Sequence, residues 1–179
     1  IYADTKVHPT EAQISAAFKR LVMELPVVGF LKGQGERDIN HFGERGYGLF
    51  AANKYFRHSL INNGFDVVEV ELDEVIPESG KILVIADVRH AFTASGMEVL
   101  EAYINRGGNL LIAVEPDKKE LVSPLLSLLG VEILPGRLVK QQENYPVDFI
   151  LAKPTREAES LSYIFKDLAR REQVITQPG

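Results

Sequence analysis

Strand-like apolar runs alternate with helical patterns through the middle of the chain, and this alternation limits the folds it can adopt. The runs occupy residues 27–31, 65–72, 81–87 and 109–116, and apolar residues recur at helical spacing over 47–63, 93–108 and 118–130. A continuous apolar run such as 27–31 is typical of a strand covered on both faces in a parallel sheet. The pattern predicts a three-layer α/β fold with a mainly parallel sheet, whose central strands include 27–31, 81–86 and 109–114.

The two ends of the chain follow this pattern less clearly. Residues 11–25 predict a leading helix capped by Thr10 and ended by Pro26. Toward the other end we expect a strand, an exposed loop, a strand, a helix and an edge strand, over residues 131–135, 136–146, 147–152, 154–172 and 173–176. Without a repeat or a linker, residues 1–179 are predicted to form one soluble α/β domain, a fragment of a longer membrane-anchored protein.

Composition excludes several kinds of site. The chain has 179 residues, and its 25 acidic against 20 basic residues give a net charge of -5, which argues against nucleic acid as a partner. It has no cysteine, which removes disulfides, thiolate nucleophiles and zinc-thiolate sites. No apolar run approaches the ~20 residues of a membrane-spanning helix, so contact with a membrane would come only through segments absent from this chain.

The segment "VVGFLKGQGER" (27–37) ends a central strand in a glycine loop. A dinucleotide-binding fingerprint needs a third glycine where Asp38 stands, and no Gly-Lys-Ser or Gly-Lys-Thr follows for a P-loop, so no cofactor is expected. Open α/β sheets bind ligands at the carboxyl ends of their strands, where Gly33 and Gly35 would let the backbone approach a partner. The alternative is a tight turn in which Glu36 and Arg37 are solvated.

The next candidate site follows the strand 81–86. Asp87, Arg89 and His90 stand where a class I amidotransferase or a hydrolase carries its nucleophile, yet the chain has no cysteine and no G-x-S-x-G. Thr93 and Ser95 are better explained as the start of a helix than as nucleophiles. We therefore expect no catalytic residue here.

Acidic residues also follow the strand 109–114. Glu115 and Asp117, together with Asp87, could bind Mg²⁺ as in phosphoacceptor domains of similar topology. Those domains also need an acidic pair after the first strand, where this chain has Leu31 and Lys32. Acids at a helix amino terminus explain the pattern better, and no metal site is expected.

Because parallel strands end at the same edge, we expect these segments to form one site for a ligand or a partner. Arg37 and Arg89 could offer forked donors to a carboxylate, with Glu36 orienting one of them. In the structural alternative, Glu36 only caps a turn or pairs with an arginine. The candidate binding residues are Gly33, Gly35, Glu36, Arg37, Asp87, Arg89, His90 and Glu115.

The G-x-G-E loop at 33–36 and the block "YINRGGNLLIAVEP" at 103–116 carry a resemblance to a known family. Over residues 10–140 the chain resembles the GldG-like auxiliary proteins of ABC transport systems, which are associated with gliding motility. The domain also looks like the inert relatives of the class I glutamine amidotransferase fold. "RDINHFGERGYG" (37–48) departs from the pattern as an apparent insertion.

The resemblance implies a domain outside the cytoplasmic membrane, on the periplasmic side, with permease and ATPase subunits as partners. We therefore expect a non-catalytic, extracytoplasmic recognition domain of an ABC transporter auxiliary component. The alternative is a small hydrolase or transferase that uses the acids and His90 at the carboxyl edge.

Overall fold

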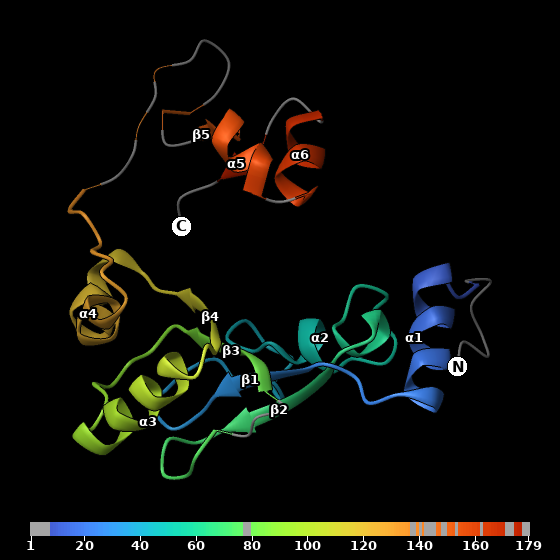
Figure 1. Cartoon of the computed structure of the whole chain (residues 1–179), viewed down its shortest axis with the longest axis horizontal. Coiled ribbons are helices and arrows are strands. Elements are labelled where there is room, and N and C mark those ends of the chain that lie inside the picture. Colours follow the sequence, from blue (N-terminus) through green and yellow to red (C-terminus); the bar gives the residue numbers. More distant parts are fainter. Residues whose placement is uncertain are drawn as a thin grey trace. The chain divides into compact units, whose positions relative to one another are not determined.

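The computed structural model describes most of the chain, and these residues form two compact units (Figure 1). The units are Ile1–Ile133 and Leu134–Gly179. The described residues are 8–76, 80–136, 139, 141, 146–147, 150–152, 154–161, 163–170 and 174–176. Each unit is described by itself, so the prediction of one domain stays a prediction.

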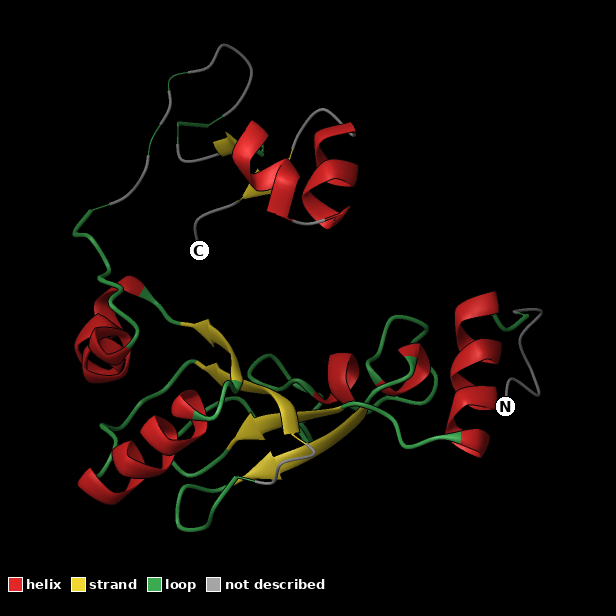
Figure 2. Ribbon diagram, viewed as in Figure 1, coloured by secondary structure: helices red, strands yellow, loops and turns green. Residues whose placement is uncertain are grey.

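The first unit is built on a parallel sheet of four strands (Figure 2). Its strands lie in the order β2-β1-β3-β4, where β1 is Val27–Leu31, β2 is Asp66–Val70, β3 is Gly80–Ala86 and β4 is Asn109–Ala113. The register places Gly29 opposite both Val68 of β2 and Leu83 of β3. All three pairings are parallel, which confirms the predicted α/β, flavodoxin-like fold.

Helices cover the two faces of this sheet. On one face, α3 (Ala94–Asn105) and α4 (Lys119–Leu128) bury Leu100, Tyr103 and Leu125 against Leu83 and Ile85 of β3. On the other face, the short helix α2 (Gly48–Ala51) and the loop before it cover Val28, Phe30 and Val84. The strands supply both cores because successive side chains point to opposite faces.

Two predictions about strands are wrong. β4 is an edge strand and not a central one, since in the described sheet it pairs only with β3. Residues 131–135 form no strand, and the segment leaves Val131 and Leu134 exposed. Without that segment alongside, β4 keeps only an intermittent burial pattern, with Leu111 more than half exposed.

The helix predicted over 47–63 is also wrong. Only α2 and a single 3-10 turn, η1 (Ile61–Asn63), form there. The side-chain oxygen of Asn53 accepts hydrogen bonds from the backbone amides of Tyr55 and Phe56, at 2.7 and 2.9 Å. The side-chain amide of Asn62 donates to the backbone carbonyls of Asn53 and Phe56. Asparagine side chains that bond to nearby backbone compete with the helical ladder, which explains the break.

The first helix, α1 (Glu11–Val22), begins as predicted and ends early. Thr10 and Gln13 form a reciprocal capping box, which confirms the predicted cap. The helix ends before Met23, whose backbone is already extended, whereas the sequence predicted an end at Pro26. Proline disfavours helical geometry in the residue before it, and here the chain leaves the helix a turn sooner.

The second unit pairs β5 (Ile150–Ala152) with β6 (Val174–Thr176) in antiparallel register. Two helices, α5 (Arg156–Leu161) and α6 (Tyr163–Arg170), lie between them in the sequence. These elements confirm the predicted strand and edge strand, whereas two described helices stand where one was predicted over 154–172. The predicted loop at 136–146 lies largely outside the described residues.

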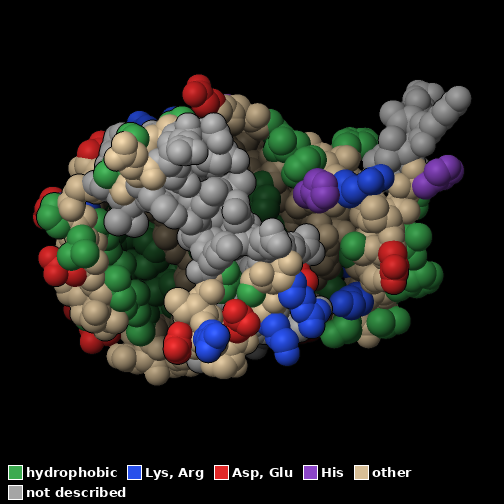
Figure 3. Space-filling view, turned by 90° about the horizontal axis from the view of Figure 1, so that it is seen from above, with side chains coloured by type: hydrophobic (Ala, Val, Ile, Leu, Met, Phe, Trp, Pro, Cys, Tyr) green, Lys and Arg blue, Asp and Glu red, His purple; other side chains and the backbone are tan. Residues whose placement is uncertain are grey.

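The surface mixes both signs of charge. Figure 3 shows basic and acidic side chains interspersed over the face drawn there, with hydrophobic side chains between them. Several large apolar side chains of α1 are exposed, among them Phe18, Leu21 and Val22. Among the described helices, none combines the length and apolar character that crossing a membrane requires.

Replacing Thr93 with alanine is expected to lower the free energy of unfolding by about 1 kcal/mol. The Thr93 hydroxyl accepts a 3.0 Å hydrogen bond from the amide of Gly96 and so caps α3, a helix of the buried core. Urea denaturation followed by circular dichroism measures the loss. Thr93→Ser keeps the hydroxyl and should retain most of the stability, and equal losses for both variants would contradict the capping role.

Candidate functional site

The loops that follow β1 and β3 meet at the carboxyl edge of the sheet. The carbonyl of Gln34 accepts hydrogen bonds from the amides of Arg89 and His90, at 2.8 and 3.0 Å. The amide of Arg37 donates to the carbonyl of Ala86 at 3.4 Å. The two candidate loops are therefore joined through their backbones.

Glycine is required in the first of these loops. Gly33 and Gly35 have φ values of 117° and 81°, in the region that side chains disfavour. A Cβ atom on Gly35 would lie 2.9 Å from the Cβ of Arg89, whereas one on Gly33 would meet nothing within 4 Å. Gly35 thus serves the close approach of the two loops, and Gly33 faces open space.

Asp87 is the centre of a group of charged side chains, the Asp87 cluster, which also contains Arg37, Arg45, Glu115 and Lys118. It is 5% exposed, and its φ of 57° is the single positive value among the described non-glycine residues. Its Oδ1 accepts from Lys118 Nζ at 2.5 Å and its Oδ2 from Arg45 Nη1 at 2.6 Å. Arg37 Nε lies 3.6 Å from Oδ2 as a looser ion pair. One buried carboxylate therefore holds three cations.

These contacts change the protonation equilibria of the cluster. Burial alone would raise the pKa of Asp87, but hydrogen bonds and charges from Lys118 and Arg45 outweigh it, so the pKa lies below its ordinary value. The same hydrogen bond from Lys118 to Asp87, with a second one to Glu115, raises the pKa of the ammonium group. Both groups are thus held in their charged forms around neutral pH.

We expect Asp87 to make folding stability fall in acid. Because its folded-state pKa is lowered, its contribution is present above the unfolded pKa of about 3.9 and is lost as pH falls through the folded pKa. Urea unfolding midpoints between pH 7 and pH 2 measure this slope. Asp87→Asn cannot titrate and should flatten that part of the profile, and an unchanged profile would contradict the assignment.

The two candidate glutamates differ in their contacts. Glu115 Oε2 accepts from Lys118 Nζ at 2.6 Å, so Asp87 and Glu115 share one lysine. Glu36 Oε2 accepts from the amide of Gln34 at 2.7 Å, and its buried Oε1 has no partner among the described contacts. Glu36 therefore bonds back to the amide two residues before it, whereas the structural alternative had it cap the following turn or pair with an arginine.

The candidate arginines are used unequally. Arg37 donates to the carbonyl of Glu44 at 3.0 Å, and its guanidinium lies 5.8 Å from the ring centroid of Tyr47. Arg89 and His90 are exposed, and the described contacts give their side chains no hydrogen bond or ion pair. The Arg89 side chain therefore keeps all its donors for a ligand.

Arg45 and Lys118 belong to the Asp87 cluster but were not predicted from the sequence. Lys118 stands three residues after Glu115 in the 3-10 turn η2 (Pro116–Lys118), a spacing that places the two side chains together. Arg45 comes from the apparent insertion. There a backbone bridge joins Asp38 to Gly46, and the folded loop brings Arg45 to Asp87. No local sequence pattern predicts this contact between Arg45 and Asp87.

The contacts of Asp87 limit its use in acid–base chemistry. Its carboxylate accepts hydrogen bonds from two cations, whereas a general base needs hydrogen-bond access to the proton it removes. The described residues contain no group of three or more His, Asp or Glu suited to a metal ion. Asp87 and Glu115, which the magnesium alternative would use, share Lys118.

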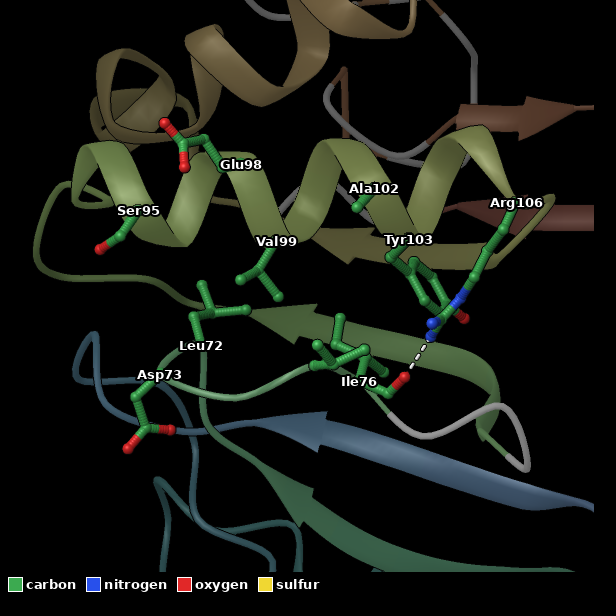
Figure 4. Close-up of a pocket in the computed structure, with 10 residues that line it drawn as sticks. Leu72, Asp73, Ile76, Ser95, Glu98, Val99, Ala102, Tyr103 and Arg106 are labelled. Atoms are coloured by element: carbon green, nitrogen blue, oxygen red, sulfur yellow. Dashed lines mark hydrogen bonds between the residues drawn. The ribbon is translucent and has the colours of Figure 1, made fainter.

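A separate cavity of about 460 Å³ lies between α3 and the segment after β2 (Figure 4). It is lined by Leu72, Asp73, Val75, Ile76, Ser95, Glu98, Val99, Ala102, Tyr103 and Arg106. Arg106 crosses one end, donates to the carbonyl of Ile76 and lies 5.2 Å from the ring centroid of Tyr103. None of the candidate residues predicted from sequence lines it.

A family model described as an ABC-type uncharacterized transport system, ABC_transp_aux, matches residues 25–177. The chain belongs to this family. The match runs from before β1 to beyond β6 and so includes residues of both units. No curated protein and no solved structure matches the chain.

The family match confirms the expected relation to auxiliary proteins of ABC transport systems. The matched range, 25–177, contains the G-x-G-E loop at 33–36 and the block at 103–116. Membership connects the chain to an ABC transport system. The family description names neither gliding motility nor an amidotransferase.

Proposed function

We propose that this chain is a non-catalytic recognition domain of an ABC transporter auxiliary component. Its family membership supports a role in an ABC transport system. The observation that carries the recognition role is the Asp87 cluster, in which one buried carboxylate holds Lys118 and Arg45 at the carboxyl edge. Such an edge is where open α/β sheets bind their partners.

Two features of the edge support recognition. Residues that the fold holds rigidly, such as the backbone-joined loops at 33–37 and 87–90, offer a surface whose shape is set before binding. Arg89 and His90 project from that surface without a described partner. Exposed, unpaired charge on a fixed loop is suited to a complementary group.

The location, the relation to amidotransferase-like domains and the partners in this proposal rest on the resemblance to GldG-like proteins. In this view the domain lies outside the cytoplasmic membrane, resembles inert amidotransferase-like domains, and acts with permease and ATPase subunits. A reporter fused beside the domain in the membrane-anchored protein checks the location, and a cytoplasmic reporter signal would contradict it. Co-purification with tagged permease and ATPase subunits checks the partners.

Replacing Arg89 and His90 together with alanine is expected to abolish most transport function in a complementation assay. Both side chains are exposed, and surface substitutions usually change stability by only about 0.5 kcal/mol, so folding should be retained. The matched control is Lys54→Ala with His58→Ala, one exposed cation and one exposed histidine outside the site. Full transport by the Arg89 and His90 double variant would contradict the recognition role.

A further inference from the structure

We infer that the carboxyl edge binds an oxyanion, the carboxylate or phosphate group of a ligand or partner. The inference rests on the recognition function proposed above and adds the chemical class of the group recognised. Around Asp87 the structure gathers three cations, Arg37, Arg45 and Lys118, and the exposed Arg89 stands two residues further along the chain. Three carboxylates, those of Asp87, Glu115 and Glu36, accompany them. In the ion-paired network itself, three cations thus meet two carboxylates, those of Asp87 and Glu115.

The cations have donors to spare. A guanidinium group carries five N–H donors and an ammonium group three. Arg45 uses one on Asp87 and a weak one on the carbonyl of Gly35, and Lys118 uses two, on Asp87 and Glu115. The Arg45 side chain is 37% exposed, and Arg89 is exposed without a described partner. Solvent-facing donors therefore remain after the internal contacts are made.

Asp87 acts as a positioning residue for these donors. Its two oxygens each fix one cation, and its burial prevents the carboxylate from turning toward solvent. The carbonyl of Gln34 fixes the backbone of Arg89 at the same time. Donors held in place before binding lose less conformational freedom when an anion arrives, which strengthens binding.

The place of the cluster in the sheet favours a ligand. Strand order reverses between β1 and β3, since β2 lies beyond β1 on one side and β4 beyond β3 on the other. Such switch points are where doubly wound sheets bind ligands. Beside it, the amides of Gly33 and Gly35 have no acceptor among the described contacts, and Gly33 faces open space. Free amides in a glycine loop add donors suited to an oxyanion.

Titration of the ¹⁵N-labelled chain with inorganic phosphate, and separately with acetate, tests the inference by NMR. The sodium chloride concentration is lowered as each anion is added, so that the ionic strength stays constant. We expect saturable shifts at the amides of residues 33–37 and 87–90. Arg89→Gln should weaken binding about tenfold, because it removes a charge-assisted hydrogen bond and a full charge. Arg156→Gln, which removes an equal exposed charge in the other unit, should leave the affinity unchanged.

The two anions distinguish the source of the group. Tighter binding of phosphate supports a phosphate-bearing ligand, and tighter binding of acetate supports a carboxylate. Shifts that chloride alone reproduces, or equal weakening by Arg89→Gln and Arg156→Gln, would overturn the inference. Failure to bind either anion, combined with lost transport in the Arg89 and His90 variant, overturns the oxyanion while keeping recognition. Anion binding with full transport overturns the recognition function instead.

Discussion

Replacing Asp87 with alanine is expected to lower the free energy of unfolding by about 3 kcal/mol, because it leaves partly buried cations without their counter-charge. Asp87 is 5% exposed and accepts from Lys118 at 2.5 Å and Arg45 at 2.6 Å. The side chains of Lys118 and Arg45 are 20% and 37% exposed. Water therefore compensates them in part, which places the loss at the lower end for a broken buried pair.

The backbone adds to this loss. Asp87 has a φ of 57°, and a left-handed conformation costs ordinary residues roughly 1–2 kcal/mol, a cost that aspartate and asparagine reduce by local hydrogen bonding. Asp87→Asn is the matched control, since it keeps the shape, one acceptor oxygen and this tolerance. We expect its loss to be about half that of alanine. Urea denaturation measures both variants, and an alanine variant as stable as the parent would contradict the central role of Asp87.

Replacing Gly108 with alanine is expected to destabilise the first unit by about 3 kcal/mol through overpacking. An added Cβ would lie 2.3 Å from Tyr103 Cε1 and 2.4 Å from Tyr103 Cζ. The ring has no easy way to move, because Tyr103 is 2% exposed and its hydroxyl donates to the carbonyl of Asn109 at 3.0 Å. The clash therefore has to displace α3 from β4.

Gly130→Ala provides the comparison for Gly108. Gly130 has a φ of 67°, and a Cβ there would meet nothing within 4 Å, so this variant carries backbone strain of about 1 kcal/mol without a clash. Thermal unfolding followed by circular dichroism ranks the two variants. A Gly108→Ala variant that unfolds at or above the temperature of Gly130→Ala would show that the core around Tyr103 adapts, against this prediction.

The sheet was predictable where its strands are buried on both faces. β1 and β3 are continuous apolar runs, and the structure finds both in the centre of the sheet. β4 was misplaced because a strand's neighbours depend on residues far along the chain. Residues 131–135 have the composition of a strand but do not pair in the described sheet, which leaves β4 at the edge.

Helix prediction failed where side chains bond to the backbone. Residues 47–63 show helical spacing, but Asn53 and Asn62 bind nearby amides and carbonyls and replace the helix with turns. Periodicity records which residues are apolar and does not record such bonds. The caps were easier, since Thr10 and Thr93 act over three residues along the chain.

The sequence by itself determined the α/β architecture and placed Arg37, Asp87 and Glu115 in the segments that follow strands, because apolar strand and helix patterns are local properties. Only the tertiary structure decided what those residues do. It brought Arg45 across from the loop before α2 and turned Glu36 back onto its own turn. The loop's path depends on packing that no short segment encodes. Asp87 thereby became a buried centre holding three cations, and Arg89 the exposed cation beside it.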